Sequence, residues 1–377
     1  MKLKIGYLIS FILIRIIGIF SKINKGQVLF LSETRNELGG NLEKMNEIVS
    51  AEKYNKKYYL KDKTKLKITI KDKIKMYKLI STSEYILLDD FCTVISFMRL
   101  KKNQKVIQLW HGPGAYKKFG LSRQDKNPGK LKRFLTHRNY TNAIVTSEDV
   151  RWCYAEGFGM PKEKVLATGY PRTDIFFDNK YIEKTKKELY KKYPDFKNKK
   201  VITFAPTYRG VSLNKSYYDY DKLDLDKIYK ELHNEYIFIV KLHPGLKNSP
   251  EKEKFEKDLK KHSDFYYDLT SYRDINDILL ITDVLITDYS SVIFDYLLVN
   301  KPIVYFTYDL DKYENDRGVY YPFDDYIYGE ISKNTSELIK AIKKENMMYD
   351  QREKFNNKFM SACDGNSTKK TYEAFFK

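Results

Sequence analysis

The segment from Asp283 to Asp295 constrains the fold more than any other part of the chain, because it changes from strand to helix character within a few residues. Residues 284–286 are a short apolar run typical of a buried parallel strand. Side chains that cap helices follow at residues 287–291, and an apolar helix face comes next. Such a helix start presents unpaired N–H groups and a partial positive charge, which suits a diphosphate. An ordinary capped helix of an α/β domain explains the same residues equally well.

The rest of the chain alternates strand and helix signals, which predicts parallel sheets. Strands are expected at residues 27–31, 57–60, 67–70, 85–88, 106–110, 143–145, 164–167, 201–204, 236–240, 284–286 and 303–306. Helices are expected up to residue 50, from residue 147, at 181–193, 222–233, 251–262 and 275–281, and two or three times after residue 335. A plausible linker follows the Lys-rich helix, at Pro194 and residues 197–200.

We therefore predict an α/β fold with two Rossmann-like, doubly wound domains that face each other across a cleft. The N-terminal domain covers residues 26–180. The C-terminal domain covers residues 181–377, and its last helix could pack back on the first domain.

The chain carries 69 Lys and Arg residues against 50 Asp and Glu residues, a formal net charge of +19. This excess favours a polyanionic partner, although scattered lysines from a Lys-rich proteome give the same number. The sequence holds no zinc-finger, RNP-like or basic-region pattern, so we predict no nucleic-acid partner. Three distant cysteines, Cys92, Cys153 and Cys363, argue against a disulfide framework and favour a reducing compartment.

Residues 5–20 form an apolar run, and Lys22 and Lys25 follow it. A transmembrane helix needs about 20 apolar residues, and this shorter run contains Arg15. A secretory signal fits the basic start, but no small-x-small cleavage site follows. We favour a helix that lies in the cytoplasmic leaflet with its lysines on anionic headgroups, and a single span is the alternative. Residues 1–25 would then attach a peripheral or monotopic protein to the cytoplasmic face of the cell membrane.

Polar segments follow five predicted strands, at the edge where open α/β sheets bind ligands. These segments are 110–114, 169–174, 205–209, 241–244 and 287–291. Two of the five histidines, His111 and His243, stand in them, one in each predicted domain. Histidine exchanges a proton near neutral pH without a large pKa shift, so this pair is the candidate acid–base machinery, whereas a lone histidine would more often be structural. His137, His233 and His262 lie in polar runs and are expected on the solvated surface.

Arg172, Arg209 and Lys241 are the cations of these segments. Arginine matches phosphate geometry with two parallel N–H groups and lysine supplies a point charge, although each could instead form a surface salt bridge. Lys117 and Lys118, after the Gly-rich turn, could face the cleft or the membrane.

Carboxylates offer two further roles. Asp295 could accept a hydrogen bond from a ribose or base group, or support the helix cap. Asp-x-Asp pairs at residues 219–221, 224–226 and 309–311 could bind a metal, but the motif is short and the pairs lie in loop or helix-flanking sequence. We therefore predict no metal and no cofactor, so that the helix dipole and the cations must offset leaving-group charge.

The motifs agree as a set with one known family. They are Trp110-His-Gly112 with Lys117-Lys118-Phe-Gly120, Gly169-Tyr-Pro-Arg172 with Asp174, Pro206-Thr-Tyr-Arg209, Leu242-His-Pro244, Thr287-Asp-Tyr-Ser-Ser291 through Asp295, Pro302–Asp309, and Tyr313 with Arg317-Gly318. In this order and spacing, across residues 27–325, the chain resembles the CDP-glycerol glycerophosphotransferase family, the primases and polymerases of teichoic acid synthesis.

The resemblance implies a GT-B-like pair of domains in a monotopic enzyme of teichoic acid or related cell-wall or capsule polymer synthesis. The domain of residues 26–180 would bind the acceptor, and that of residues 181–377 would bind the CDP-alditol donor. It implies metal-independent transfer of glycerol phosphate from CDP-glycerol to a hydroxyl of a lipid-linked saccharide or polysaccharide, with release of CMP; CDP-ribitol is the other candidate donor. His111 would be the general base, and His243 would stabilise the diphosphate or assist the leaving CMP. The substrate-binding residues would be Gly112, Pro113, Gly114, Ala115, Arg172, Thr207, Tyr208, Arg209, Lys241, Leu242, Thr287, Asp288, Ser290, Ser291 and Asp295.

The sequence departs from the family pattern after His111. Many members have Thr-Pro after His-Gly, whereas this chain has Pro113-Gly-Ala-Tyr116 and one extra residue before its lysines. This variant and the chain length look more like the short, primase-type members, and they leave the acceptor open. A nucleotide-sugar glycosyltransferase of GT-B fold is the enzymatic alternative, and a non-catalytic membrane-surface protein is the third hypothesis.

Overall fold

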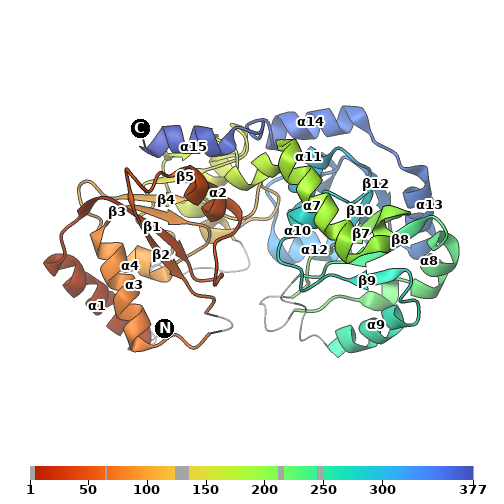
Figure 1. The fold of residues 1–377 in the computed structure, drawn as a ribbon, viewed down its shortest axis with the longest axis horizontal. Coiled ribbons are helices and arrows are strands. Elements are labelled where there is room, and N and C mark those ends of the chain that lie inside the picture. Colours follow the sequence, from red (N-terminus) through yellow and green to blue (C-terminus); the bar gives the residue numbers. More distant parts are fainter. Residues whose placement is uncertain are drawn as a thin grey trace. The chain divides into compact units, whose positions relative to one another are not determined.

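The computed structural model describes residues 5–63, 66–123, 136–210, 216–243, 246 and 250–376, in two compact units (Figure 1). Unit 1 comprises residues 1–174, 317–320 and 358–377, and unit 2 comprises residues 175–316 and 321–357. Each unit is built on one parallel six-stranded sheet, so the predicted α/β class with two parallel-sheet domains is confirmed. The predicted domain boundaries and the cleft stay predictions.

The sheet of unit 1 has the strand order β2-β1-β3-β4-β5-β6, and all neighbouring strands are parallel. Its strands are β1 (Asn24–Ser32), β2 (Asn55–Leu60), β3 (Ser83–Leu88), β4 (Lys105–Gln108), β5 (Asn142–Ile144) and β6 (Val165–Leu166). Its helices are α1 (Ile5–Phe20), α2 (Gly40–Ile48), α3 (Ile70–Thr82), α4 (Thr93–Phe97), α6 (Arg151–Phe158) and α15 (Ser367–Phe376), with 3-10 turns η1 (Gly120–Ser122) and η2 (Lys162–Lys164). Apolar residues of the central strands form the core with α2 and α15.

The sheet of unit 2 has the order β12-β11-β10-β7-β8-β9 and is also parallel throughout. Its strands are β7 (Lys200–Phe204), β8 (Tyr236–Val240), β9 (Tyr266–Asp268), β10 (Val284–Thr287), β11 (Ile303–Phe306) and β12 (Glu330–Ser332). Its helices are α7 (Asn179–Lys192), α8 (Leu225–Leu232), α9 (Pro250–Lys260), α10 (Ile275–Leu279), α11 (Val292–Val299), α12 (Leu310–Arg317), α13 (Thr335–Lys344) and α14 (Tyr349–Phe359), with 3-10 turns η4 (Pro194–Lys197), η6 (Tyr220–Lys222) and η8 (Phe323–Tyr326). The chain passes from unit 1 into unit 2 through η3 (Pro171–Phe177), and α14 ends in unit 1.

Both strand orders contain a topological switch point. In unit 2 the first strand, β7, lies between β8 and β10, and in unit 1 β1 lies between β2 and β3. Ligands of open α/β sheets bind outside the carboxyl ends of the strands at such a point. In unit 2 these ends carry two of the predicted segments, residues 205–209 and 287–291. In unit 1 they carry the loops after β1 and β3, and the loop with His111 follows the neighbouring strand β4.

The main error in the predicted elements concerns residues 67–70, which were expected to form a strand. They lead into α3, where Thr69 and Asp72 form a capping box: the Thr69 side chain accepts from the Asp72 N–H, and Asp72 accepts from the Thr69 N–H. The β-branched residues of this segment gave the false strand signal. Strands β9 and β12, of three residues each, and helices α4 and α12 are absent from the prediction.

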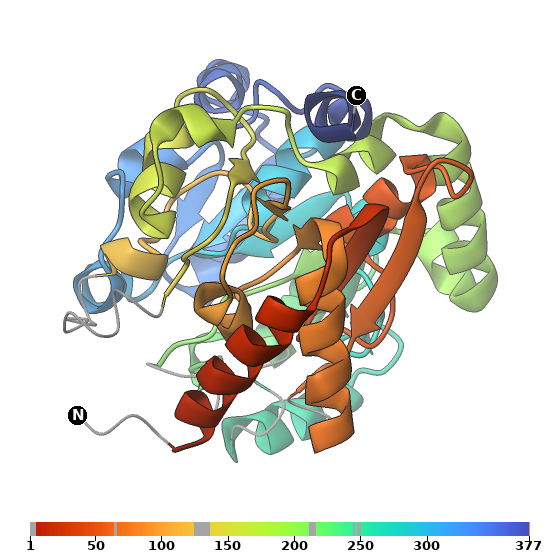
Figure 2. The same ribbon diagram turned by 90° about the vertical axis from the view of Figure 1, so that its left-hand side faces the viewer.

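Helix α1 lies alongside α3 and also packs on α4 (Figure 2). Ile14 is buried, and the rings of Tyr7 and Phe11 meet Phe97 edge to face. Arg15, within the apolar run, donates from Nε to the Phe97 carbonyl. Other large apolar side chains of the same helix are exposed: Leu8, Ile9, Ile12, Ile16, Ile19 and Phe20.

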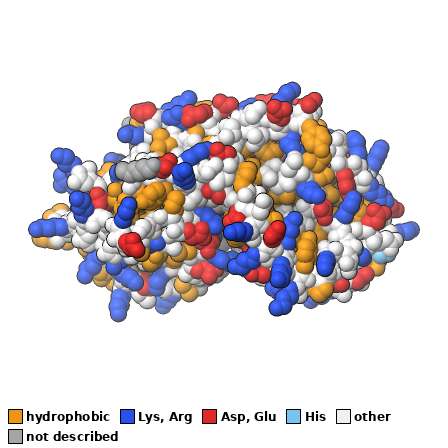
Figure 3. Space-filling view, turned by 45° about the horizontal axis from the view of Figure 1, so that its top comes forward, with side chains coloured by type: hydrophobic (Ala, Val, Ile, Leu, Met, Phe, Trp, Pro, Cys, Tyr) orange, Lys and Arg blue, Asp and Glu red, His pale blue; other side chains and the backbone are white. Residues whose placement is uncertain are grey.

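No helix within the described residues combines the length and the hydropathy that crossing a bilayer requires. The charged side chains are distributed over the surface: on the face shown in Figure 3, Lys and Arg alternate with Asp and Glu. All three cysteines are buried.

Candidate functional site

His111 stands just beyond the carboxyl end of β4, and its side chain is 49% exposed. Its Nδ1 lies 3.2 Å from the backbone oxygen of Asp89 and 3.8 Å from Oδ1 of Asp90. Because a carbonyl oxygen only accepts hydrogen bonds, Nδ1 carries the proton in this contact. The basic nitrogen of the neutral ring is therefore Nε2, as a general base at this position requires.

The residue before His111 has a strained backbone. Trp110 has a φ of 53°, in the left-handed region that costs a bulky residue about 1–2 kcal/mol. The centroid of its indole lies 4.6 Å from that of the His111 ring, 5.4 Å from that of Phe119 and 5.2 Å from that of Phe158. A large side chain held in this conformation indicates that the surroundings of His111 are tightly specified.

His137 is buried, which contradicts the expectation that it lies on the solvated surface. It is 6% exposed, its ring centroid lies 5.1 Å from that of Phe158 and 6.0 Å from that of Trp110, and Nδ1 lies 3.2 Å from the Tyr140 hydroxyl. Burial lowers the pKa of His137 to about 4, so the ring is neutral at neutral pH. The prediction failed because the Trp110 and Phe158 rings, which pack on His137 together with the nearby Tyr140, come from other parts of the chain.

Tyrosine hydroxyls hold the turn that follows His111. The Tyr154 hydroxyl lies 2.6 Å from the Gly112 carbonyl and 2.9 Å from the Gly114 carbonyl, and the Tyr170 hydroxyl lies 3.1 Å from Gly112. The Gly114 N–H donates to Oγ1 of Thr146. These bonds fix the turn from within the protein. Of the predicted binding residues here, Gly112 is half-buried, and three are buried: Pro113, Gly114 and Ala115.

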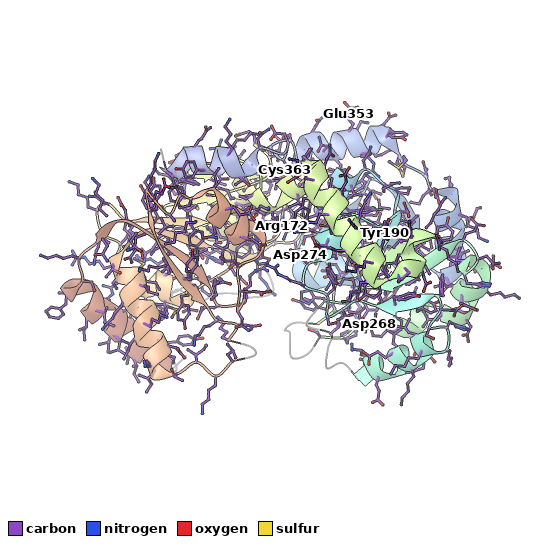
Figure 4. All side chains as sticks on the ribbon, viewed as in Figure 1. Arg172, Tyr190, Asp268, Asp274, Glu353 and Cys363 are labelled. Atoms are coloured by element: carbon purple, nitrogen blue, oxygen red, sulfur yellow. The ribbon has the colours of Figure 1, made fainter. Side chains whose placement is uncertain are left out.

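Arg172 lies on the segment that follows β6 and is half-buried (labelled in Figure 4). Its backbone N–H donates to Oδ1 of Asn41, while Nδ2 of Asn41 donates to the carbonyls of Leu109 and Trp110. Asn41, at 2% exposure, therefore connects two of the predicted segments. The sequence analysis missed it, because an asparagine at a helix start has no chemical signature beyond the glycine pair before it.

Three strand ends of unit 2 lie in register at one edge of the sheet. Phe204 of β7 pairs with Val240 of β8 and with Ile286 of β10. The Lys241 N–H donates to the Phe204 carbonyl, and the Ala205 N–H donates to the Ile286 carbonyl, each at 2.9 Å. The segments that follow these strands therefore begin at the same level, as the sequence predicts.

Thr287 and Asp288 bond to the protein itself, and both are fully buried. Oγ1 of Thr287 donates to the Ala205 carbonyl at 2.7 Å. Oδ1 of Asp288 accepts from the backbone N–H groups of Thr207 and Tyr289 at 2.8 and 2.7 Å. These bonds join the loop after β7 to the loop after β10 at the switch point.

Arg209 lies in a buried charged cluster that uses most of its donors. Nη1 donates to Oδ2 of Asp288 and to the Thr207 carbonyl, and Nε and Nη2 donate to the two oxygens of Asp309, all at 2.7–2.8 Å. Burial alone would lower the pKa of Arg209, but the two carboxylates outweigh it and raise the pKa. At 5% exposure, the guanidinium links loops of unit 2. Four tyrosine rings lie 5.0–5.6 Å from it: Tyr218, Tyr289, Tyr308 and Tyr313.

Ser290 and Ser291 are the accessible residues at the start of α11. Ser291, the N-cap, is exposed and makes no side-chain capping bond, whereas Oγ of Ser290 accepts from the Val292 N–H at 3.4 Å. The four predicted capping side chains thus divide into an inner pair that ties loops and an outer pair at the helix start. Asp295, in the first turn of α11, is 1% exposed.

Lys241 and Leu242 hold the loop after β8. The Lys241 ammonium donates to the backbone carbonyls of Thr270 and Tyr272 at 3.1 and 2.6 Å and is half-buried. Leu242 is 2% exposed, and its N–H donates to Oγ1 of Thr270. These bonds fix where the ammonium lies at the strand ends.

His243 is exposed at the end of the same loop, and its ring centroid lies 4.8 Å from that of the half-buried Tyr208. Because Tyr208 follows β7 and His243 follows β8, neighbouring strands bring an imidazole and a phenol together. Thr207, beside Tyr208, is 6% exposed. Pro244, part of the predicted motif, lies outside the described residues.

Each Asp-x-Asp pair has at least one carboxylate with a protein partner. Asp221 pairs with Lys254 at 2.6 Å, and Oδ1 of Asp226 lies 2.9 Å from Nε2 of His262. Asp224 caps α8, and Asp309 binds Arg209. Within the described part of the chain, no three His, Cys, Asp or Glu residues are grouped as metal ligands would be.

The model of one protein family, described as CDP-glycerol:poly(glycerophosphate) glycerophosphotransferase, matches residues 13–377. The teichoic acid poly(ribitol-phosphate) polymerase of Bacillus spizizenii is 40% identical over 93% of this chain and 56% of its own length. The ribitol-phosphate polymerase TarK of Staphylococcus aureus is 35% identical over 93% of the chain and 68% of its own, and the B. spizizenii ribitol-phosphate primase is 35% identical over 77% and 74%.

Solved structures show the same fold at low identity. The wall teichoic acid polymerase TagF matches with a TM-score of 0.79 and 23% identity, over 99% of this chain and 98% of the solved one. The UDP-GlcNAc 2-epimerase of Neisseria meningitidis matches with a TM-score of 0.54 and 15% identity, over 94% and 99%. This chain spans 56% of the length of the B. spizizenii polymerase.

Proposed function

The chain belongs to the CDP-glycerol:poly(glycerophosphate) glycerophosphotransferase family, and we propose that it transfers an alditol phosphate from a CDP-alditol to an acceptor hydroxyl, with release of CMP. The acceptor is a lipid-linked saccharide or polysaccharide of teichoic acid or related polymer synthesis. The observation that carries the proposal is the geometry of His111, whose Nδ1–H contact with Asp89 leaves Nε2 as the base on a half-exposed ring.

In the proposed reaction, the acceptor oxygen attacks the phosphorus that carries the alditol. The bond from that phosphorus to the CMP oxygen breaks, and the hydroxyl proton passes to Nε2 of His111. A positioned base of this kind contributes about 10²–10⁴ in rate. CMP leaves with the electron pair of the broken bond, so its phosphate needs stabilisation.

Unit 2 supplies that stabilisation in this proposal. The start of α11, with Ser290 and Ser291, offers N–H groups and hydroxyls to the diphosphate. Lys241 adds positive charge, and His243 beside Tyr208 stabilises the diphosphate or protonates the leaving CMP. We assign Arg209, Thr287 and Asp288 to holding these loops in place. Arg172 in unit 1 is proposed to bind substrate phosphate.

CDP-ribitol is the donor that the relatives favour. The ribitol-phosphate polymerases of Bacillus spizizenii and Staphylococcus aureus are 40% and 35% identical, whereas the glycerol-phosphate primase of Bacillus subtilis is 31% identical over 78% of the chain. The differences are small, and primases and polymerases both occur among the relatives. Glycerol therefore stays the second candidate alditol.

A donor screen tests the proposal. Purified full-length chain is incubated with CDP-ribitol, CDP-glycerol, UDP-sugars or CMP-sugars and with lipid-linked saccharide acceptors, and CMP release and product mass are measured. We expect CMP release with a CDP-alditol and a product heavier by one or more alditol phosphates. Turnover with a nucleotide sugar alone would replace the proposal by a GT-B glycosyltransferase, and no turnover with any donor would leave a binding protein.

We also propose that α1 attaches the protein to the cytoplasmic face of the cell membrane as a peripheral or monotopic segment. Seven large apolar side chains of α1, Tyr7 included, are exposed, while Ile14 faces the protein. Lys22 and Lys25 after the helix are also exposed. Exposed apolar residues on one helix with flanking lysines suit an anionic membrane surface.

Vesicle flotation tests the membrane proposal. We expect Ile12→Asp with Ile16→Asp to abolish binding to phosphatidylglycerol vesicles. Ile331→Asp, an equally exposed apolar site on β12, is the matched control and should still bind. Equal flotation of both variants would contradict the proposal that α1 binds the membrane.

We further propose that transfer needs no metal ion. The family resemblance implies this, and in each Asp-x-Asp pair one carboxylate is engaged by a side chain of the protein: Asp221 by Lys254, Asp226 by His262 and Asp309 by Arg209. Turnover should survive chelation by EDTA, and activity lost in EDTA and restored by a divalent cation would refute this part of the proposal.

A further inference from the structure

We propose that Asn41 is a positioning residue for His111, and that it acts with Gln108 through the backbone of Trp110. The inference rests on the proposed function, because it concerns the base of that reaction. Asn41 and Gln108 are 2% and 0% exposed, and neither side chain has a chemical role of its own in the transfer.

Asn41 holds the carbonyl groups on both sides of Trp110. Its Nδ2 donates at 3.0 Å to the carbonyl of Leu109 and at 3.0 Å to that of Trp110, so both amide hydrogens are used on consecutive peptide groups. Its Oδ1 accepts from the Arg172 N–H at 3.0 Å. One buried amide thus satisfies three backbone groups, two of which flank the strained residue.

Gln108 holds the backbone N–H of Trp110. Its Oε1 accepts from the Trp110 N–H at 2.9 Å, and its Nε2 donates to the Asp90 carbonyl at 3.1 Å. The preceding residue, Asp89, supplies the carbonyl that faces Nδ1 of His111. Gln108 therefore fixes Trp110 and the loop that selects the tautomer of His111.

These bonds hold Trp110 at a φ of 53°, a conformation that its own sterics disfavour. The direction of the His111 side chain follows from the backbone at this residue. Without the Asn41 amide, the carbonyls of Leu109 and Trp110 lose their donors. The backbone of Trp110 would then relax toward negative φ, because that change relieves its steric strain. Nε2 would then move from its place at the strand end, although the donor loops of unit 2 stay unchanged.

The test compares two amide-to-carboxylate substitutions. Asn41→Asp keeps the acceptor for Arg172 but places an oxygen against the carbonyls of Leu109 and Trp110. Gln104→Glu is the matched control, because Gln104 is 3% exposed and its Nε2 also donates to two carbonyls, those of Ile80 and Ser83, away from the site. Asn41→Ser, which removes the amide without adding charge, serves if Asn41→Asp does not fold.

We expect kcat to fall about 10²-fold in Asn41→Asp or Asn41→Ser with the KM for the CDP-alditol unchanged, because a displaced base misses the reacting hydroxyl. Gln104→Glu should lower the melting temperature and leave kcat unchanged. An Asn41 variant with the same kcat as Gln104→Glu would overturn the inference. A variant in which only the KM for the CDP-alditol rises would overturn it as well.

Nitrogen NMR of labelled imidazoles gives a readout that needs no activity. The His111 signal, identified by its loss in His111→Gln, should report the Nδ1-protonated tautomer in the wild type and a mixture in the Asn41 variant. An unchanged tautomer would overturn the inference whether or not the wild type releases CMP. Absence of CMP release from a wild type with the expected tautomer would refute the proposed function instead.

Discussion

The strand-end loops of the two units lie at equivalent edges of their sheets but are held by different chemistry. In unit 1 the loop with His111 is held by neutral groups, the amides of Asn41 and Gln108 and the hydroxyl of Tyr154. In unit 2 the loops are held by a buried ion cluster of Arg209, Asp288 and Asp309. The loop of unit 1 leaves the His111 ring half-exposed, whereas the cluster of unit 2 buries the Arg209 guanidinium.

This difference shows that position at a strand end does not by itself make a residue a ligand. A buried ion pair needs both partners and cannot spare its charge for a substrate, because an unpaired buried charge is costly. A neutral hydrogen bond costs less to lose, and it restrains geometry without adding charge beside the His111 ring. Substitutions in the ion cluster of unit 2 should therefore lower the free energy of unfolding more than substitutions around His111 do.

The largest expected effect follows from removing Arg209. Arg209→Met leaves Asp288 buried without its guanidinium, so the free energy of unfolding should fall by about 3–5 kcal/mol, as measured by urea denaturation. Lys254→Met, which breaks the exposed pair with Asp221, is the matched control and should cause no measurable change. Similar losses for the two variants would contradict the assignment of Arg209 to a buried cluster.

A smaller effect should appear on acidification through His137. Its pKa is about 4 when folded and about 6.5 when unfolded, so below pH 6.5 the unfolded chain binds more protons. This contribution is constant above pH 6.5 and is lost as the pH falls toward 4, by about 2 kcal/mol at pH 5. His137→Phe should weaken the dependence of unfolding free energy on pH between 7.5 and 5. An unchanged slope would mean that the ring is not buried as a neutral group.

The smallest expected effect is a difference in the free energy of unfolding between substitutions of the inner and the outer residues after β10. Thr287→Val loses the bond to the Ala205 carbonyl and should cost about 1 kcal/mol. Ser291→Ala should cost less than about 0.5 kcal/mol, because Ser291 makes no capping bond. Ser291→Ala should instead raise the KM for the donor. The reverse order of stability losses would contradict the division into an inner and an outer pair.

Much of the fold could be predicted because apolar periodicity is local. Apolar composition alone predicts buried strands at residues 201–204, 236–240 and 284–286. The register that joins these strands follows from their parallel pairing. Residues 67–70 show the limit, since the same β-branched pattern precedes a capped helix. Strand β9 was missed because its three residues, Tyr-Tyr-Asp, include no aliphatic side chain.

The site could be predicted in part. His111 and the segments at the strand ends follow from motif and topology, but which way a side chain turns depends on partners far away in the sequence. Arg209 meets Asp309 a hundred positions later, and Asn41 meets Arg172 across 131 positions. Neither pairing leaves a trace in local sequence. The buried state of His137 was hidden for the same reason.

The most direct test of the account is CMP release by His111→Ala with the CDP-alditol that the wild type uses. Donor binding by calorimetry serves as the control that unit 2 is intact. We expect turnover to fall by about 10²–10⁴ while the donor Kd stays the same, because in the proposed reaction Nε2 of His111 receives the acceptor proton. Wild-type turnover in the variant would contradict the assignment of His111 as the base. It would also contradict the role that we give to the loop after β4.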